Sequence, residues 1–221
     1  MPKIKWLDPP NYIFFLPQRY DSHFLVKAML DLKDRIHYKH ILPYNSEQYR
    51  AITIDQFTFM DSYQFMSASL DKLMDNLRKT VKPSEMSVIN SCRGSMTNGV
   101  FDIEKRNLQL SKGLVPWGLV NGRRHLKTPR KTLPLEKEHY FSDLTESYPE
   151  EAAIEQASKY YQKYECKNLL DYIMFYCETD TVQLAECFHN FRMKLFKFAN
   201  LDILKFVGKY QKFKLIRTMH T

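Results

Sequence analysis

The feature that most constrains this fold is a helical pattern that begins near Lys167 and continues to about Asn200. Within it, apolar side chains lie three or four residues from one another at the start and again from Leu184 onward, the spacing that brings them to one face of an α-helix. The apolar positions are Leu170, Ile173, Met174, Leu184, Phe188, Phe191, Leu195 and Phe198. The pattern predicts a domain whose C-terminal side is helical.

The preceding part of the chain predicts strands followed by helices. We expect a strand at 12–15, a helix at 21–37, strands at 52–54 and 57–60, a helix capped by Ser69 and a helix that follows Pro149. Residues 81–135 hold five of the six glycines, so we expect long connections there with little regular structure. Strands followed by helices indicate an α/β domain.

Positive charge is concentrated in two stretches. The chain has 221 residues and a formal net charge of +8. Residues Arg192–Thr221 hold eight basic residues and one acid, Asp202, and residues Arg123–Lys131 hold five basic residues. Such stretches suit a polyanion, because each neutralised phosphate releases counterions. A basic surface that only keeps the protein soluble fits the charge equally well.

Several classes of protein are not indicated. No apolar run approaches the roughly 18 residues of a membrane helix, and the N-terminus lacks the pattern of a signal peptide. The four cysteines and seven histidines have neither zinc-ligand spacing nor the density of a disulfide framework. We therefore expect an intracellular protein with reduced thiols, no zinc site and no membrane partner.

Three segments, in their order along the chain, carry a resemblance to a known family. FFLPQRYDSHFLVKAML has an aromatic residue followed by Asp21 at a helix start, and FTFMDSYQFMSASLDKLMDNL has a strand, an Asp-Ser step and a helix. CKNLLDYIMFYCETDTVQLAECFHNFR contains Tyr-x-x-x-Asp at Tyr176 and Asp180. With SKGLVPW and LPLEKEHYFSDL between them, they resemble the 3′–5′ exonuclease domain of family B DNA polymerases. The likeness is to the protein-primed branch of phages, organellar plasmids and self-synthesising transposons, from about Tyr12 to Arg192.

The resemblance implies a ribonuclease H-like α/β fold, a mixed sheet flanked by helices. Residues 1–200 would form part of the exonuclease domain and 201–221 a basic tail. The family's first motif, Asp-x-Glu on a strand, is not found before Asp21, and no polymerase palm follows. We therefore expect a domain truncated at its N-terminal strands. Asp102 and Glu104 spell Asp-x-Glu but lie between the second and third motifs, so we interpret them as a coincidence.

The resemblance implies a catalytic set of Asp21, Tyr176 and Asp180, with Asp21 and Asp180 as ligands of Mg²⁺ or Mn²⁺. Read physically, Tyr176 and Asp180 are four residues apart and share one helix face, where the phenol can hydrogen-bond a water and the carboxylate can hold a divalent ion. The alternative is a packed Tyr176 and a solvated Asp180. Without the first motif's two carboxylates, we expect no appreciable exonuclease activity from the chain alone.

The candidate DNA-binding residues are Tyr20, Ser62, Tyr63, Lys112, Arg123 and Arg124. The resemblance implies a serine that contacts single-stranded DNA, in a motif Ser/Thr-Leu-x-x-apolar. Ser62 fits this serine by its position after the strand, whereas Ser69, followed by Leu70, fits the motif's sequence better. Tyr20, Tyr63 and Phe24 are candidates for stacking on bases, although core packing is the favoured role of Phe24.

The implied function is that of a DNA-directed DNA polymerase family member whose exonuclease region binds single-stranded DNA or a primer terminus. Partners implied are a terminal protein or the remaining parts of a polymerase. Two alternatives stay open: a non-enzymatic nucleic-acid-binding protein derived from a mobile element, and an unrelated basic structural protein that matches the motifs by chance.

Overall fold

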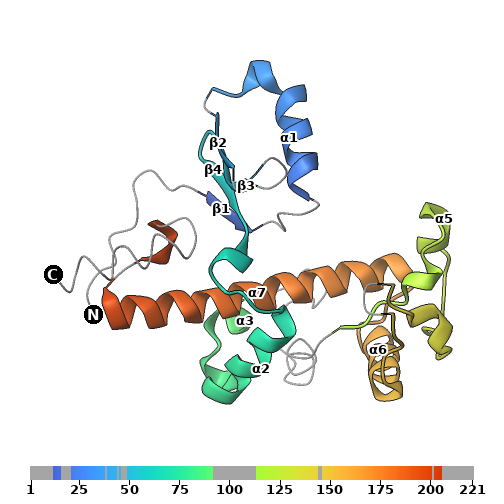
Figure 1. Ribbon diagram of the computed structural model, residues 1–221. Coiled ribbons are helices and arrows are strands. Elements are labelled where there is room, and N and C mark those ends of the chain that lie inside the picture. Colours follow the sequence, from blue (N-terminus) through green and yellow to red (C-terminus); the bar gives the residue numbers. More distant parts are fainter. Residues whose placement is uncertain are drawn as a thin grey trace. The chain divides into compact units, whose positions relative to one another are not determined.

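The computed structural model divides the chain into two compact units (Figure 1). Unit 1 comprises residues 1–68 and 191–221, and unit 2 comprises residues 69–190. The structure describes residues 12–15, 21–37, 39–43, 45, 49–91, 113–143, 146–200 and 202–205. For eight of these residues the structure gives the helix or strand but not the side chain: 12–15, 21, 22, 33 and 205.

Unit 1 is built on a four-stranded mixed sheet with the order β1-β4-β3-β2. Strand β3 pairs antiparallel with both β2 and β4, whereas β1 is parallel to β4, with Tyr12 opposite Phe57 and Phe15 opposite Met60. Its elements are β1 (Tyr12–Phe15), α1 (Asp21–Asp31), η1 (Lys33–Arg35), β2 (Lys39–Pro43), β3 (Tyr49–Ile54), β4 (Phe57–Met60), η2 (Ser62–Gln64), the last residues of α7 (Leu169–Ala199) and η7 (Ile203–Lys205).

The strands predicted at 52–54 and 57–60 are confirmed, and they pair as the hairpin β3–β4. Asp55 in its turn has φ of 50°, a left-handed conformation that Asp tolerates, and its Oδ1 accepts a hydrogen bond from the backbone N–H of His37 at 3.1 Å. Ala51 and Ile52 are adjacent on β3 and both are buried. Because adjacent strand residues point to opposite faces, both faces of the sheet are covered at this point.

Strand β2 is an element that the sequence did not predict. Its side chains are mostly exposed, so the apolar pattern that reveals a buried strand is weak. Near its end the register shifts, so that Leu42 pairs with Ala51 but Pro43 pairs with Tyr49. Proline lacks the backbone N–H that a regular ladder uses, which is consistent with an edge strand that becomes irregular at Pro43.

Helix α1 is shorter than the predicted 21–37, since it ends at Asp31 and is followed by η1. The expectation that Phe24 packs in the core is wrong, because its side chain is 74% exposed. Of the α1 side chains that the structure describes, that of Met29 is the buried one. Met29 lies five positions after Phe24, which places the two about 140° apart around the helix axis.

The end of α7 and η7 are joined by an ion pair in unit 1. The Arg192 guanidinium donates from Nε to Asp202 Oδ1 at 2.8 Å and from Nη2 to Asp202 Oδ2 at 2.5 Å. Asp202 Oδ1 also accepts the Leu204 N–H at 3.2 Å, and the next residue, Ile203, is fully buried. Arg192 is the first residue of the C-terminal basic stretch, but its charge is offset by Asp202.

Unit 2 is helical with irregular connections. Its elements are α2 (Leu70–Thr80), η3 (Pro83–Glu85), α3 (Ser87–Ser91), η5 (Trp117–Leu119), α5 (Arg123–Leu126), η6 (Lys137–Tyr140), α6 (Glu151–Lys163) and the larger part of α7. Ser69 caps α2 as predicted, its Oγ accepting the Lys72 N–H at 3.4 Å. Helices α6 and α7 are both confirmed, with α7 close to its predicted bounds.

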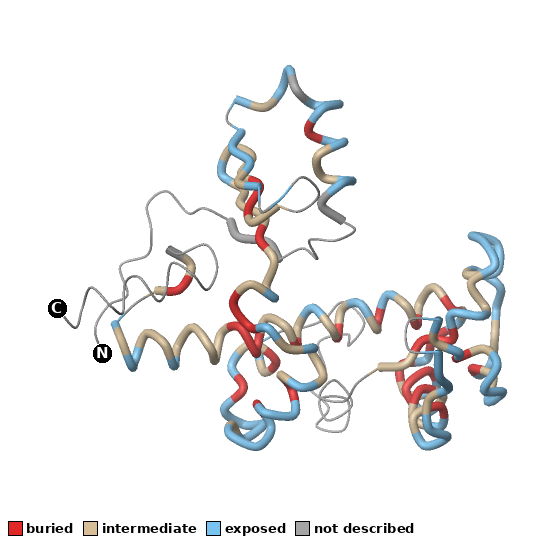
Figure 2. The backbone as a smooth tube through the Cα atoms, in the orientation of Figure 1, coloured by how far each residue is buried: buried red, intermediate tan, exposed pale blue. Residues whose placement is uncertain are grey.

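The main core of unit 2 joins α6 and the first turns of α7 to the irregular segment 113–140 (Figure 2). Tyrosines do much of this joining, since their rings are buried while their hydroxyls donate to backbone carbonyls. Tyr172 donates to Leu114 at 2.8 Å and Tyr161 to Arg130 at 2.9 Å. Connections without regular backbone pairing are thereby held to the helices.

The chain is thus a mixed α/β protein. Among the described residues, no helix is both long and apolar enough to cross a membrane.

Candidate functional site

Tyr176 and Asp180 lie one turn apart in the middle of α7, within unit 2. The Tyr176 hydroxyl donates a hydrogen bond to the Asp180 carboxylate. Burial, and secondarily the Asp180 charge, raises the pKa of Tyr176 well above its ordinary value, so the phenol stays protonated and acts as a donor. The structure confirms that the two share a helix face. It does not support a simply solvated Asp180, because that side chain is partly buried and hydrogen-bonded.

Gly113 brings a distant segment onto this pair. A β-carbon at residue 113 would lie 2.4 Å from Cδ2 of Tyr176, so the backbone there approaches the ring more closely than any other residue type permits. The next residue, Leu114, accepts the hydrogen bond of Tyr172, one turn earlier on α7. The Lys-Gly-Leu-Val step therefore meets the Tyr-x-x-x-Asp motif, although Lys112 itself lies outside the described residues.

Polar side chains continue along this part of α7. Thr179 and Gln183 are 4% and 3% exposed, at positions where a packing helix would place apolar residues. The Thr179 hydroxyl has no hydrogen-bond partner within the described part of the chain. Neither residue was predicted as part of the site; the available signal was that both continue the three- and four-residue spacing of the buried Tyr172 and Phe175.

The described residues do not by themselves fit a two-metal centre. Asp180 is the one carboxylate described at the pair, and it already accepts the Tyr176 hydrogen bond. Within the described ranges no group of three or more His, Cys, Asp or Glu side chains is arranged to hold a metal. Asp21 is the first residue of α1 in unit 1, and its side chain lies outside what the structure describes. Its expected meeting with Asp180 stays a prediction.

The predicted single-strand motif lies at the end of the sheet in unit 1. Asp61 caps η2, its Oδ1 accepting the Tyr63 N–H at 2.9 Å, while the Ser62 carbonyl accepts from Phe65 and Met66 at 3.0 Å each. Tyr63 is 59% exposed, as a stacking ring must be. The rival serine, Ser69, uses its hydroxyl to cap α2.

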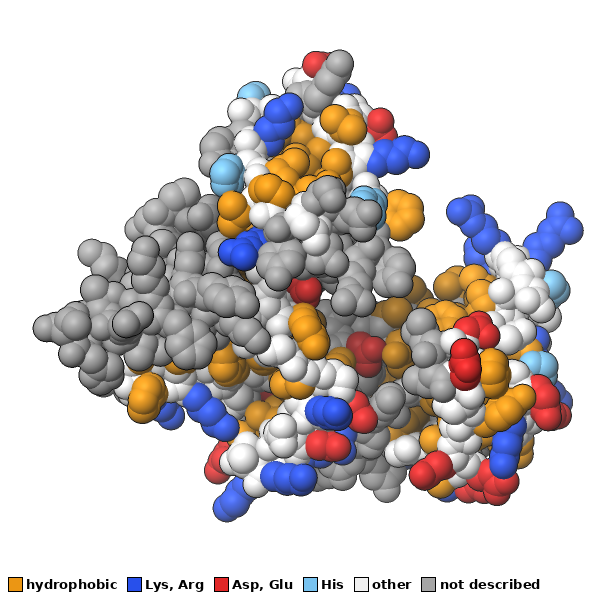
Figure 3. Space-filling view, viewed as in Figure 1, with side chains coloured by type: hydrophobic (Ala, Val, Ile, Leu, Met, Phe, Trp, Pro, Cys, Tyr) orange, Lys and Arg blue, Asp and Glu red, His pale blue; other side chains and the backbone are white. Residues whose placement is uncertain are grey.

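Arg123 and Arg124 are both exposed on the short helix α5. Lys and Arg side chains project from this end of unit 2 in Figure 3. Tyr20 lies outside the described residues. Trp117 was not predicted as a site residue, yet its side chain is 57% exposed on η5. Its backbone is closely packed, since a β-carbon on the adjacent Gly118 would lie 3.0 Å from the backbone of His139.

Comparison of the chain with protein-family models, curated proteins and solved structures found no match. What the site does must therefore follow from its residues. The Tyr176–Asp180 pair offers a protonated phenol and a carboxylate on a rigid helix, closed on one side by Gly113. That arrangement is suited to positioning a polar ligand group, whereas hydrolysis of a phosphodiester would need further charged groups.

Proposed function

We propose that this chain is an exonuclease-type domain of the protein-primed family B DNA polymerases, with a ribonuclease H-like fold, and that it binds single-stranded DNA. One observation carries the proposal. Tyr176 and Asp180 are hydrogen-bonded on a half-buried helix face, and the segment that follows Lys112 packs directly against Tyr176. Two segments that carry the resemblance, SKGLVPW and the Tyr-x-x-x-Asp motif, thus lie together in unit 2.

The sheet of unit 1 supports the proposed fold. It is mixed, with β1 parallel to β4 and an antiparallel arrangement of β2, β3 and β4. The Asp61-Ser62 step follows β4 directly, and α1 follows β1, with Asp21 as its first residue. Ser62 therefore lies where a strand ends, a place where α/β proteins commonly carry their sites, and Asp21 lies at the start of the helix that follows β1 in the chain.

In the proposed function, the residues of the chain bind and orient DNA rather than cleave it. The Tyr176 hydroxyl donates to Asp180 and keeps that carboxylate oriented. Mg²⁺ or Mn²⁺, when bound, would supply the charge neutralisation that phosphodiester hydrolysis requires. The described donors are too few for a two-metal centre, so binding without appreciable hydrolysis is the expected behaviour.

A second candidate is a nucleic-acid-binding protein with no enzymatic role. The observation that favours it is the single described carboxylate at the Tyr176–Asp180 pair, which is paired with a phenol rather than with other acids. Both candidates predict binding of single-stranded DNA. They differ in whether a nucleotide is ever released from a 3′ end.

The test combines fluorescence anisotropy on a labelled oligothymidylate with an assay for nucleotide release in Mg²⁺ or Mn²⁺. We expect binding that weakens steeply with salt, and no release above the level of Asp180→Ala. Glu178→Ala is the matched control, because it removes a carboxylate from the same helix on a different face. Wild-type protein that fails to bind at low salt would refute both candidates. Release well above Asp180→Ala would favour the enzyme, with Asp102 and Glu104 next to be tested.

The basic tail can be tested separately. Because Asp202 pairs with Arg192 and Ile203 is buried, the deletion should begin after Lys205 so that this anchor is kept. It removes Lys209, Lys212, Lys214 and Arg217. If these residues bind phosphates, the salt dependence of binding should flatten by about 0.7 in slope for each phosphate that the shortened chain no longer neutralises. An unchanged slope would mean that the tail does not bind DNA.

A further inference from the structure

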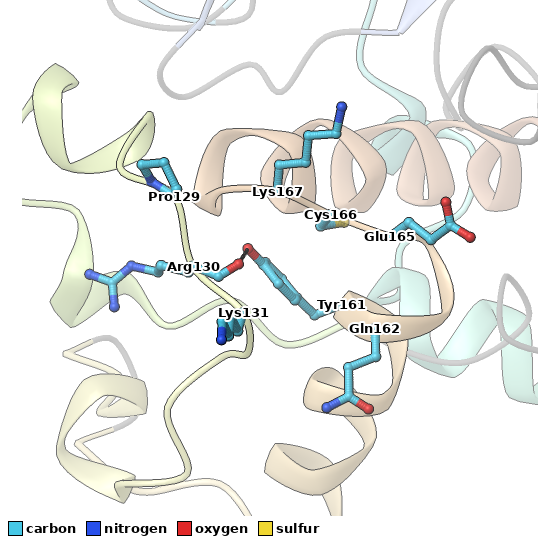
Figure 4. Close-up of a pocket in the computed structure, with 8 residues that line it drawn as sticks. All are labelled: Pro129, Arg130, Lys131, Tyr161, Gln162, Glu165, Cys166 and Lys167. Carbon is cyan, nitrogen blue, oxygen red and sulfur yellow. Dashed lines mark hydrogen bonds between the residues drawn. The ribbon is translucent and has the colours of Figure 1, made fainter.

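Unit 2 contains a cleft of about 620 Å³ at the junction of α6 and α7 (Figure 4). One wall is the extended segment Pro129–Lys131, and the other is the end of α6 with the connection to α7. The residues that line it are Pro129, Arg130, Lys131, Tyr161, Gln162, Glu165, Cys166 and Lys167.

Main-chain contacts hold the two walls in place. The Arg130 N–H donates to the Lys167 carbonyl at 2.9 Å, and Pro129 forms an antiparallel bridge with Asn168. Across the cleft, the buried Tyr161 hydroxyl donates to the Arg130 carbonyl at 2.9 Å, the contact drawn in Figure 4. The cleft is therefore already formed without a ligand, and a ligand would bind without the entropic cost of ordering its walls.

The charge of the cleft is unbalanced. Arg130, Lys131 and Lys167 line it, against one acid, Glu165. Within the described part of the chain, none of the three cationic side chains forms an ion pair. The Arg130 Nε is buried and has no acceptor there. An anion in the cleft would pair with this excess of positive charge through charge-assisted hydrogen bonds.

The arrangement of the cations favours a polymer over a small anion. In Figure 4 the Arg130 side chain extends away from the Tyr161 hydroxyl, whereas Lys167 leaves the opposite wall in another direction. Cations that diverge do not converge on one phosphate, but they can contact successive phosphates of a strand. The same segment continues N-terminally to the exposed Arg123, Arg124 and Lys127, which lengthens the basic surface.

We propose that this cleft binds the sugar–phosphate backbone of single-stranded DNA through Arg130, Lys131 and Lys167. The inference rests on the proposed function and extends it to a surface away from the Tyr176–Asp180 pair. Tyr161 is fully buried and its hydroxyl is already bonded, so the cleft offers no exposed ring for stacking. Its contribution is electrostatic and independent of base sequence.

The experiment compares two triple variants of the full chain. Arg130→Gln with Lys131→Gln and Lys167→Gln removes three charges from the cleft. Lys72→Gln with Lys79→Gln and Lys82→Gln removes the same charge from exposed positions in and after α2. Affinity for a labelled oligothymidylate is measured over a range of salt concentrations, and circular dichroism with thermal unfolding shows whether each variant is folded. Inorganic phosphate and polyglutamate serve as competitors.

We expect the cleft variant to bind about tenfold more weakly and its salt slope to fall by about 2, which corresponds to three phosphate contacts on a single strand. The α2 variant should lose much less affinity.

Equal losses of affinity in the two variants would show an effect of net charge alone and overturn the proposal. Polyglutamate that competes as well as DNA would overturn it in favour of an acidic protein partner. If the triple variant is unfolded, Lys167→Gln alone is measured against Lys79→Gln under the same criteria. Wild-type protein that binds no DNA would refute the proposed function and the cleft together, whereas intact binding by the cleft variant would refute the cleft alone.

Discussion

The backbone of Gly113 lies against the ring of Tyr176, so that a β-carbon at residue 113 would stand 2.4 Å from Cδ2 and 2.8 Å from Cε2 of that ring. Gly113→Ala should therefore displace the ring and destabilise the protein by about 1–3 kcal/mol, the usual cost of overpacking. Displacing Tyr176 also breaks its hydrogen bond to Asp180. Urea unfolding measures the first effect, and affinity for single-stranded DNA measures the second.

The matched experiment is a double-mutant cycle with Tyr176→Ala. Once the ring is removed, the added methyl group has space, so Gly113→Ala should cost less in that background. Equal costs in both backgrounds would show that the two residues do not interact.

Glu186 provides a test of how α3 is held. This fully buried carboxylate on α7 accepts the Ile89 N–H at 2.8 Å through Oε2 and the Asn190 amide at 2.7 Å through Oε1. Glu186→Ala leaves both donors without these acceptors and should cost about 1–3 kcal/mol or more. Glu186→Gln keeps one acceptor oxygen and should cost less. Chemical denaturation measures the free energy of unfolding of both variants, with Glu155→Ala, at an exposed position, as the control. Equal losses of stability in Glu186→Gln and Glu186→Ala would contradict the prediction.

Stability should fall at alkaline pH through buried thiols. Burial, and secondarily Glu186, raises the pKa of Cys187 to about 11 from an ordinary value of 9.0. A raised folded-state pKa contributes stability below the unfolded value, and this is lost as pH rises from about 9 to 11. Over this whole pH range the loss is about 2–3 kcal/mol, since one pKa unit corresponds to about 1.4 kcal/mol. Unfolding free energies measured between pH 8 and 10.5 should fall less steeply in Cys187→Ala.

The control for this experiment is Met74→Leu, because the Cys187 thiol donates to the Met74 sulfur at 3.4 Å. It changes the same packing but keeps the titratable group, so its pH dependence should match that of the wild type. If the free energy of unfolding fell with pH as steeply in Cys187→Ala as in the wild type, the loss of stability would not come from the Cys187 thiol.

Trp117 should report DNA binding directly. The chain has two tryptophans, Trp6 and Trp117, so Trp6→Phe leaves Trp117 as the one emitter. Because its exposed ring stands on a closely packed turn, stacking on a base should quench its fluorescence saturably. Trp117→Ala should then weaken binding by about 1–3 kcal/mol. Unchanged emission under conditions where anisotropy shows binding would exclude Trp117 from the interface.

The long helices and the hairpin could be predicted from the sequence because their signals are local. Apolar residues at three- and four-residue spacing predicted α7 close to its actual bounds, and Ser69 predicted the start of α2. The four-residue spacing of Tyr176 and Asp180 likewise required only a helix to bring them to one face. Strand β2 escaped prediction because its side chains are mostly exposed, and a strand with little burial carries little apolar pattern.

Other features were decided by tertiary structure, because they depend on which surfaces meet. The sequence placed an apolar stripe on α1, but packing buried Met29 and left Phe24 in solvent. The contact of Gly113 with Tyr176, and the cleft between Arg130 and Lys167, join segments that are far apart in the chain. No local spacing encodes such contacts. They arise when buried tyrosines must satisfy their hydroxyls, and the nearest available acceptors are the carbonyls of an irregular segment that has no partner strand of its own.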